Sequence, residues 1–229
     1  MNKIDIYVIN LKSRVDRLDY IIDHLKNIDF ININVFEAIE NKEGWIGCTL
    51  SHLSLINYAD KNNLPYIIVL EDDFNLELDI NEFELLLRKI ITFKDIDVFN
   101  GVPGWSKLFQ KYKYFSNNDF CLSKGVLSTA FMIYYNKSYK KFNKINSINY
   151  PIDVINNLYF YQLIYNKQIG KQIPSYSSVS NNYSDHLLHY KIIYDLLKTM
   201  SFTEYEDNDD NLIYYLDKQN KLINKIKTD

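Results

Sequence analysis

The sequence has little of several features that define protein classes. It contains only 6 Gly and 4 Pro in 229 residues, which excludes collagen-like repeats and low-complexity segments over most of its length. The two cysteines, Cys48 and Cys121, are too few for a disulfide framework and form no Cys/His cluster of the zinc-binding kind. Apolar runs stay well short of the roughly 18 to 20 residues that a membrane helix needs. What is present, 47% hydrophobic and 24% charged residues, indicates a folded domain.

An excess of charge of one sign is also missing. Lys and Arg number 26 against 29 Asp and Glu, so a net charge of −3 gives no positive field that would gather nucleic acid or an anionic membrane. We therefore expect no nucleic-acid partner, no transmembrane segment, and local cations wherever an anion binds. Residues 1–11 include Asp5 and are followed by acidic and basic residues up to Asp19, a pattern that predicts neither a signal peptide nor a presequence. We expect a cytoplasmic protein.

The spacing of apolar residues predicts alternating strands and helices over the first hundred residues. Strands are expected at 4–9, 30–36, 66–70 and 96–99, and helices at 14–28, 47–62 and 78–91. Ser13 is expected to cap the first helix, with Asp16 as the acidic partner of a capping box. The apolar run at 66–70 does not alternate, which indicates a strand covered on both faces. The fold class is therefore α/β, with a mostly parallel central sheet flanked by helices.

After Gly101 the pattern changes to an α+β part. Residues 112–122 and 126–135 are predicted to form an antiparallel pair, followed by helices at 138–145, 152–165 and 187–200. Pro151 suits the first helical position, which makes Asp153 the third residue of its helix and an ordinary first-turn acid. Acidic and then basic residues between 204 and 227 suit the dipole of a last helix. Without a repeat or a linker, residues 1–229 are expected to form a single domain.

Three adjacent carboxylates, Glu71, Asp72 and Asp73, follow the buried strand at 66–70. If the strand continues, Glu71 and Asp73 project to one side and can share a ligand beyond the carboxyl end of the sheet. Two such charges ~4 Å apart repel by about 4 kcal/mol at an effective dielectric of 20. A Mn²⁺ or Mg²⁺ ion, completed by substrate phosphate, would reverse that repulsion. The alternative interpretation is a solvated acidic turn that caps the next helix.

Two of the three arginines, Arg14 and Arg17, lie where the first strand meets the first helix. Backbone N–H groups at a helix N-terminus, together with guanidinium groups, make an anion site that suits a phosphate or a nucleobase carbonyl. This is the same end of the sheet as the three acids. The alternative interpretation is a surface ion pair of Arg17 with Asp16, or of Arg14 with a glutamate.

Three other groups of residues give weaker signals. Helical spacing places His52 on an apolar face with Cys48, which predicts a buried histidine bonded to the backbone and a small core cysteine. His186 and His189, three residues apart, make His186 a candidate metal ligand. Asp153 is either a helix cap or a functional acid.

Several motifs, taken together, resemble one protein family. They are Tyr7-Val8-Ile9-Asn10-Leu11 followed by Arg14 and Asp16-Arg17, then Gly47-Cys48 with Ser51-His52, then Val69-Leu70-Glu71-Asp72-Asp73. Weaker matches follow at Ser128-Thr129-Ala130-Phe131, Pro151-Ile152-Asp153 and Ser184-Asp185. Their order resembles glycosyltransferase family 25, which includes lipooligosaccharide galactosyltransferases and collagen hydroxylysine galactosyltransferases. The resemblance spans roughly residues 4 to 186.

The resemblance implies a GT-A-like nucleotide-sugar-binding fold, with a nucleotide-binding half at 1–100 and an acceptor-side half and C-terminal helices at 101–229. It also implies a UDP-sugar donor, Mn²⁺ (or Mg²⁺), and transfer of a hexose, galactose or glucose, with inversion, to a hydroxyl of a glycan or glycoprotein. On this sequence the substrate-binding residues would be Asn10, Leu11, Arg14, Arg17, Ser51, His52, Asp72 and Asp185. Asp73, with Glu71 or Asp72, would hold the metal; Glu71 is taken as the second ligand, and His186 is added as a third candidate.

Inverting transfer needs a carboxylate that takes the acceptor proton. Asp153 is the expected base, with Asp97 and Asp185 as alternatives. The sequence departs from the family at Val154, where Glu or Trp is common, and at His186, where a small or aliphatic residue is usual. Two other functions stay open: a non-catalytic module of the same fold that binds a sugar nucleotide or a glycan, and a metal-dependent nucleotidyltransferase or phosphohydrolase. The intact acid triplet argues against the first, and the lack of a Gly-rich phosphate loop argues against the second.

Overall fold

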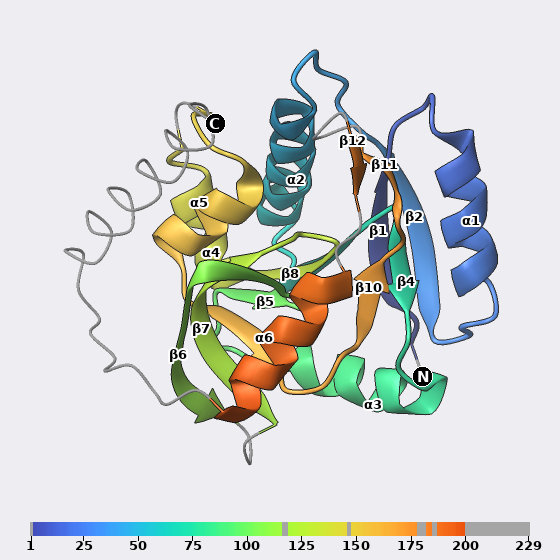
Figure 1. Ribbon diagram of the computed structural model, residues 1–229. Helices are drawn as coiled ribbons and strands as arrows, with labels where there is room; N and C mark the ends of the chain where they lie inside the picture. Colours follow the sequence, from blue (N-terminus) through green and yellow to red (C-terminus); the bar gives the residue numbers. More distant parts are fainter. Residues whose placement is uncertain (1, 116–118, 146–147, 178–181, 185–186, 200–229) are drawn as a thin grey trace.

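The computed structural model describes residues 2–115, 119–145, 148–177, 182–184 and 187–199. In chain order the elements are β1 (Ile4–Asn10), α1 (Val15–Leu25), β2 (Ile31–Glu37), α2 (Gly44–Lys61), β3 (Tyr66–Glu71), β4 (Phe74–Leu76), α3 (Ile80–Ile90), β5 (Val98–Asn100), β6 (Gly104–Phe115), β7 (Phe120–Leu127), β8 (Phe131–Tyr135), α4 (Asn136–Phe142), α5 (Ile152–Tyr159), β9 (Gln162–Tyr165), β10 (Gly170–Gln172), β11 (Ser175–Ser177), β12 (Asn182–Ser184) and α6 (Leu187–Thr199) (Figure 1). Within these residues, none of the helices combines the length and apolarity that crossing a bilayer requires. The predicted alternation of strands and helices over the first hundred residues is confirmed.

Eight strands form one sheet, in the order β2-β1-β3-β8-β5-β9-β7-β6. β1 pairs in parallel with β2 and β3, and β5 with β9, whereas β8 and β7 run against their neighbours. All strands of this sheet except β7 and β8 therefore point the same way. The expected α/β fold with a mainly parallel sheet is present, and the two reversed strands make the sheet mixed. Strands from both halves of the sequence take part in it.

Helices cover both faces of the sheet, as the contacts of the β3 side chains show. Its residues Ile68 and Leu70 belong to a core that includes α1 and α3, whereas Ile67 and Val69 belong to a second core with α2, α4 and α5. A third core joins α6 to β6, β7 and β9 (Figure 1). All four β3 residues are buried, as an apolar run without alternation predicts.

The predicted antiparallel pair was wrong in both members, because the predicted strand at 112–122 spans the end of β6 and the start of β7. β6 pairs with β7, and β8 instead lies between β3 and β5 in the middle of the sheet. All five side chains of β8, Phe131–Tyr135, are buried, so this strand needs cover on both faces, which a central position gives. The helix predicted at 152–165 was too long. α5 ends at Tyr159, and residues 162–165 form β9, another strand whose side chains are all buried.

Two predicted helix starts were also wrong, each by one residue. α1 begins at Val15 after Arg14, and in the described part of the chain no side chain caps it, so Ser13 is not its N-cap. Asp16 bonds Arg14 instead of closing a capping box. α5 begins at Ile152 after Pro151, which puts Asp153 at its second residue. The charged segment at 204–227, predicted as a last helix, lies outside the described residues.

Candidate functional site

The carboxyl ends of β1 and β3 lie side by side, and the predicted acids and arginine meet there. Because these strands pair in parallel, Asn10 at the end of β1 lies beside Asp72, just after β3. β8 runs the opposite way, so Thr129, which precedes it, reaches Glu71 at the same edge. The sheet thus brings together residues that are far apart in the sequence.

Asp72 is held by protein partners on both of its oxygens. Arg17 Nη1 donates to Oδ1 and Asn10 Nδ2 donates to Oδ2, each at 2.8 Å. Arg17 Nη1 also lies 3.3 Å from Asp73 Oδ2. Burial raises the pKa of Asp72, and the charge and hydrogen bond of Arg17 act in the opposite direction. Arg17 therefore neutralises the acids, and contacts of Asp72, Asn10 or Arg17 with substrate stay predictions.

Asp73 is buried beside two other carboxylates. Burial raises its pKa to about 7, the negative charge of Glu71 adds to this, and Arg17 acts in the opposite direction. Gln172 Nε2, on β10, lies 3.3 and 3.4 Å from the two oxygens of Asp73. The hydroxyl of Tyr190, on α6, donates to Gln172 Oε1 at 2.9 Å. No sequence signal indicated Gln172, because a single glutamine on a three-residue strand, far along the chain, matches no motif.

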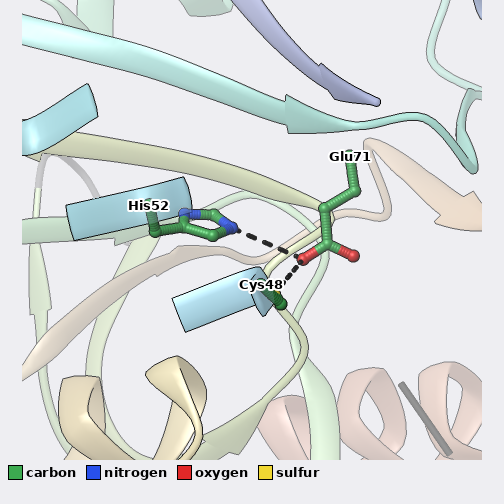
Figure 2. Close-up of side chains that lie close together, drawn as sticks. All are labelled: Cys48, His52 and Glu71. Atoms are coloured by element: carbon green, nitrogen blue, oxygen red, sulfur yellow. Dashed lines mark hydrogen bonds and ion pairs between the residues drawn. The ribbon is translucent and has the colours of Figure 1, made fainter. Parts of the chain in front are cut away.

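Glu71 extends toward two side chains of α2 (Figure 2). Its Oε1 lies 3.5 Å from His52 Nε2 and 3.8 Å from Cys48 Sγ, and it accepts a hydrogen bond from Thr129 Oγ1. His52 is completely buried, and its Nδ1 lies 3.0 Å from the hydroxyl of Tyr134. The predicted burial of His52 is confirmed. Its predicted bond to the backbone is wrong, because α2 turns this ring toward the sheet, where Tyr134 and Glu71 are its neighbours.

Glu71 and Cys48 differ in their preferred protonation states. Burial raises the pKa of Glu71, but His52, Thr129 and Arg17 outweigh that effect and the pKa lies below its usual value. The pKa of the Cys48 thiol lies well above its usual value because of burial and the charge of Glu71. At neutral pH, Glu71 is therefore an anion and Cys48 a neutral thiol.

Gly47 and Ser51 hold the start of α2 against the chain that precedes it. Ser51 Oγ donates to the carbonyl of Gly47 and accepts from the N–H of Ile39, both at 2.8 Å. A Cβ on Gly47 would lie 2.4 Å from the carbonyl oxygen of Ile39. Ser51 is completely buried, so its predicted contact with substrate would require it to leave both partners. In these two motifs, Gly47 and Ser51 thus hold the start of α2 in place, and Cys48 and His52 reach Glu71.

Replacing Gly47 by Ala should lower the free energy of unfolding by about 1 to 3 kcal/mol, because the new methyl group would displace the Ile39 carbonyl. Urea unfolding measures the loss. Gly104→Ala is the matched control, since its Cβ would lie 3.4 Å from the nearest atom, the carbonyl oxygen of Leu127, which is an ordinary contact. Equal losses for the two variants would contradict the close approach at Gly47.

Asp153 lies in the first turn of α5, and its carboxylate interacts electrostatically with Glu71. Its Oδ1 accepts from the N–H of Val154 at 2.8 Å. Burial raises the pKa of Asp153, the N–H of Val154 lowers it, and the charge of Glu71 raises it further. By contrast, Asp97 precedes β5, which runs parallel to β3, and so lies at the opposite edge of the sheet. The structure therefore argues against Asp97 as the base.

The remaining predicted residues lie at the rim of the site or outside the described part. Arg14 donates to Asp16 through Nε at 3.0 Å and Nη2 at 2.9 Å, so a surface ion pair forms as the alternative interpretation expected, but between these two residues. The carbonyl of half-buried Leu11 accepts from the N–H of Arg14. Asp185 and His186 lie outside the described residues, and their roles stay predictions.

A family model described as glycosyltransferase family 25 (LPS biosynthesis protein) matches residues 42–156, half of the chain. The match contains α2, the acids that follow β3, and Asp153. The chain belongs to glycosyltransferase family 25. The resemblance of its motifs to this family is thus confirmed, and the three side chains of Figure 2 all lie within the matched segment.

Other comparisons give more distant similarities. The chain is 25% identical over 193 residues to the iron-sulfur cluster assembly protein SufD of Plasmodium berghei (strain Anka), covering 81% of this chain but only 13% of that protein's length. Among solved structures it is similar to a glycosyltransferase involved in the glycosylation of the major capsid of PBCV-1, at 9% identity and a TM-score of 0.49 over 78% of this chain and 96% of that one. It is also similar to a mannose-1-phosphate geranyltransferase from Thermus thermophilus, at 8% identity and a TM-score of 0.44 over 72% and 74%. At these scores neither structure bears on substrate or mechanism.

Proposed function

We propose that this member of glycosyltransferase family 25 transfers a hexose, galactose or glucose, from a UDP-sugar to a hydroxyl of a glycan or glycoprotein, with inversion and with Mn²⁺ or Mg²⁺ as cofactor. The observation that carries this proposal is the arrangement of Glu71 and Asp73 at the carboxyl end of β3. Asp72 and Asp73 are buried there beside half-buried Glu71. The pKa of Asp73 rises to about 7 although Arg17 lies beside it.

These residues fit a hard divalent ion. Asp73 and Glu71 offer oxygen donors only, which is the donor type that Mn²⁺ and Mg²⁺ prefer. Burial is the main cause of the raised pKa of Asp73, and the charge of Glu71 adds to it, so its anion is poorly stabilised even beside Arg17; a divalent ion would stabilise it. When bound, such an ion stabilises negative charge that develops on the departing diphosphate. Arg17 holds Asp72 in place beside this position, and Gln172 orients the carboxylate of Asp73.

Asp153 is the proposed base. A carboxylate with a raised pKa takes up a proton more readily near neutral pH than an ordinary aspartate does. The N–H of Val154 fixes the orientation of its carboxylate. Since the base must start unprotonated, transfer should increase with pH through the pKa of Asp153.

Replacing Asp153 by Asn should lower kcat by about 100-fold or more, because the amide cannot take the proton of the acceptor. The affinity for UDP, measured by calorimetry, should stay within about twofold because the proposed donor site lies at Asp73. A variant that keeps full kcat would show that Asp153 is only a first-turn acid of α5.

The function itself is tested by incubating the full chain with Mn²⁺ and a panel of UDP-sugars and measuring UDP release with and without EDTA. Release from one UDP-sugar that EDTA stops, and that acceptors accelerate, supports the proposal. Binding without turnover of any donor would favour a non-catalytic sugar-nucleotide-binding or glycan-binding module. Pyrophosphate release from a nucleoside triphosphate and a sugar phosphate would indicate a nucleotidyltransferase.

A further inference from the structure

The cluster of Cys48, His52 and Glu71 has a feature that the proposed sugar transfer does not use. Its Sγ, ring-nitrogen and carboxylate donor atoms all lie within 4.8 Å of one another (Figure 2). Within the described residues, Nε2 of the completely buried His52 has no hydrogen-bond partner. A buried polar nitrogen without a hydrogen bond is costly, so its direction toward Glu71 and Cys48 requires an explanation.

Neither neutral form of His52 satisfies both of its ring nitrogens. If Nδ1 carries the proton and donates to the hydroxyl of Tyr134, the lone pair of Nε2 faces Glu71 Oε1 at 3.5 Å, and two acceptors confront each other. If Nε2 carries the proton, the same 3.5 Å separation still gives no aligned hydrogen bond. If both ring nitrogens carry protons, Nε2 forms an ion pair with Glu71 Oε1, again at 3.5 Å and without an aligned hydrogen bond. Glu71 Oε1 already accepts from Thr129, so a cation bound beside it would chiefly supply the partner that Nε2 lacks.

The separations of the donors suit a small tetrahedral ion. Bond lengths of about 2.0 to 2.2 Å to nitrogen and oxygen and about 2.3 Å to sulfur require about 3.4 Å between nitrogen and oxygen and about 3.6 Å between sulfur and oxygen. The observed separations are 3.5 Å for His52 Nε2 to Glu71 Oε1 and 3.8 Å for Cys48 Sγ to the same oxygen. These two separations match a tetrahedral ion closely, and the third, from Cys48 Sγ to His52 Nε2, is at most 4.8 Å and would have to shorten if it exceeds about 3.6 Å.

We propose that Cys48 Sγ, His52 Nε2 and Glu71 Oε1 bind one Zn²⁺ ion, at a site distinct from that of the Mn²⁺ or Mg²⁺ ion assigned to Asp73. A sulfur, a nitrogen and an oxygen donor together favour a borderline ion such as Zn²⁺ over Mg²⁺ or Mn²⁺. Because Cys48 is a neutral thiol in the metal-free protein, its proton is released to solvent as the bond from Sγ to the ion forms. Three protein ligands leave a fourth position for water. Tyr134 supports His52 through Nδ1, and Thr129 supports Glu71, as the outer partners of metal ligands commonly do.

The two metal sites are compatible because Glu71 uses different oxygens. Oε1 lies near Cys48 and His52, whereas the other carboxylate oxygen points away from both (Figure 2). Cys48 and Glu71 are half-buried, so an ion has access to them from solvent. The proposal does not depend on sugar transfer, because all of its readouts are measurements of metal binding.

The experiment is metal titration of the full-length chain after chelator treatment and dialysis. Mass spectrometry of the metal content should find one Zn²⁺ per chain. Titration with Co²⁺ in place of Zn²⁺ should produce a thiolate-to-cobalt charge-transfer band in the near ultraviolet. Cys48→Ser should remove that band, and His52→Gln should weaken Zn²⁺ binding by about tenfold or more. Circular dichroism checks that each variant is folded.

Two control variants separate this site from others. Cys121→Ala changes the second cysteine, which lies in the core beneath α6, and should leave the band unchanged. Asp73→Asn should leave Zn²⁺ binding unchanged while the effect of Mn²⁺ on UDP binding is lost, so the two proposals can fail separately. A wild-type chain that binds no Zn²⁺ at micromolar concentration, or a Co²⁺ complex without the thiolate band, would overturn the proposal. Cys48 and His52 would then only hold the side chain of Glu71 in position.

Discussion

Replacing Asp73 by Asn should reduce transfer by about 100-fold or more and, at the same time, stabilise the metal-free protein at neutral pH. The loss of transfer is expected because the amide is a poor ligand for the proposed divalent ion and no longer contributes its negative charge. The gain in stability is expected because Asp73 is a buried carboxylate beside Glu71 and Asp72, and the amide removes one of three neighbouring charges.

The stability effect should depend on pH in a defined direction. The pKa of Asp73 is raised from 3.8 to about 7, so between about pH 4 and pH 7 the folded protein holds a proton that the unfolded chain has released. The free energy of unfolding of the wild type therefore falls as pH rises through that window. Three pKa units correspond to about 4 kcal/mol, which is the upper limit of the gain at pH 8. Near pH 4, where Asp73 is neutral in the folded protein, the gain should be close to zero.

Urea unfolding at pH 4.5 and pH 8, with EDTA present, measures this difference. Asp119→Asn is the control, because Asp119 is an exposed partner of Lys89 and its change should be within about 0.5 kcal/mol. If Asp73→Asn is as stable as the wild type at both pH values and transfers sugar normally, the acids after β3 form only a polar turn. That result would remove the basis of the proposed function.

Replacing Arg17 by Met should lower the free energy of unfolding by about 3 to 5 kcal/mol, because Arg17 is the buried cation that faces both Asp72 and Asp73. Its side chain is only 10% exposed, so water cannot take its place. The variant would leave buried carboxylates without their counter-charge. Chemical unfolding at pH 7 measures the loss.

Arg88→Met is the matched control for Arg17→Met. Arg88 pairs with Glu84 one turn away on α3, with about a quarter to a third of each side chain exposed, and such pairs contribute about 0.3 to 0.5 kcal/mol. Adding Asp72→Asn to Arg17→Met should recover part of the lost stability, because it removes one of the uncompensated charges. Similar losses for Arg17→Met and Arg88→Met would show that Arg17 does not neutralise the acids.

The positions of the acids and arginines at one edge of the sheet were predictable from the sequence. An apolar run followed by three carboxylates indicates a buried strand and its carboxyl end, and both signals are local. Parallel pairing of β1 with β3 then places Arg17 near Asp72. The sequence did not predict that Arg17 pairs with Asp72 and Asp73. An arginine that binds phosphate and one that neutralises a carboxylate have the same sequence pattern.

The residues that surround Glu71 and Asp73 were only partly visible in the sequence. Cys48 and His52 fall on an apolar helical face, which is equally consistent with an inert core, and nothing in their spacing indicates that Glu71 lies opposite. Thr129 reaches Glu71 only because β8 runs against β3, and Gln172 reaches Asp73 only because β10 pairs with β4.

Local sequence patterns were enough to establish most of the strands and helices, the cover of helices on both faces of the sheet, and the three acids that follow a central strand. Hydrophobic periodicity and strand ends are properties of a few consecutive residues, so they can be read without knowing the fold. Long-range packing was needed to establish that β8 enters the middle of the sheet, that Arg17 pairs with Asp72, and that Cys48 and His52 face Glu71. These contacts join distant segments, and many pairings of such segments satisfy the same local pattern.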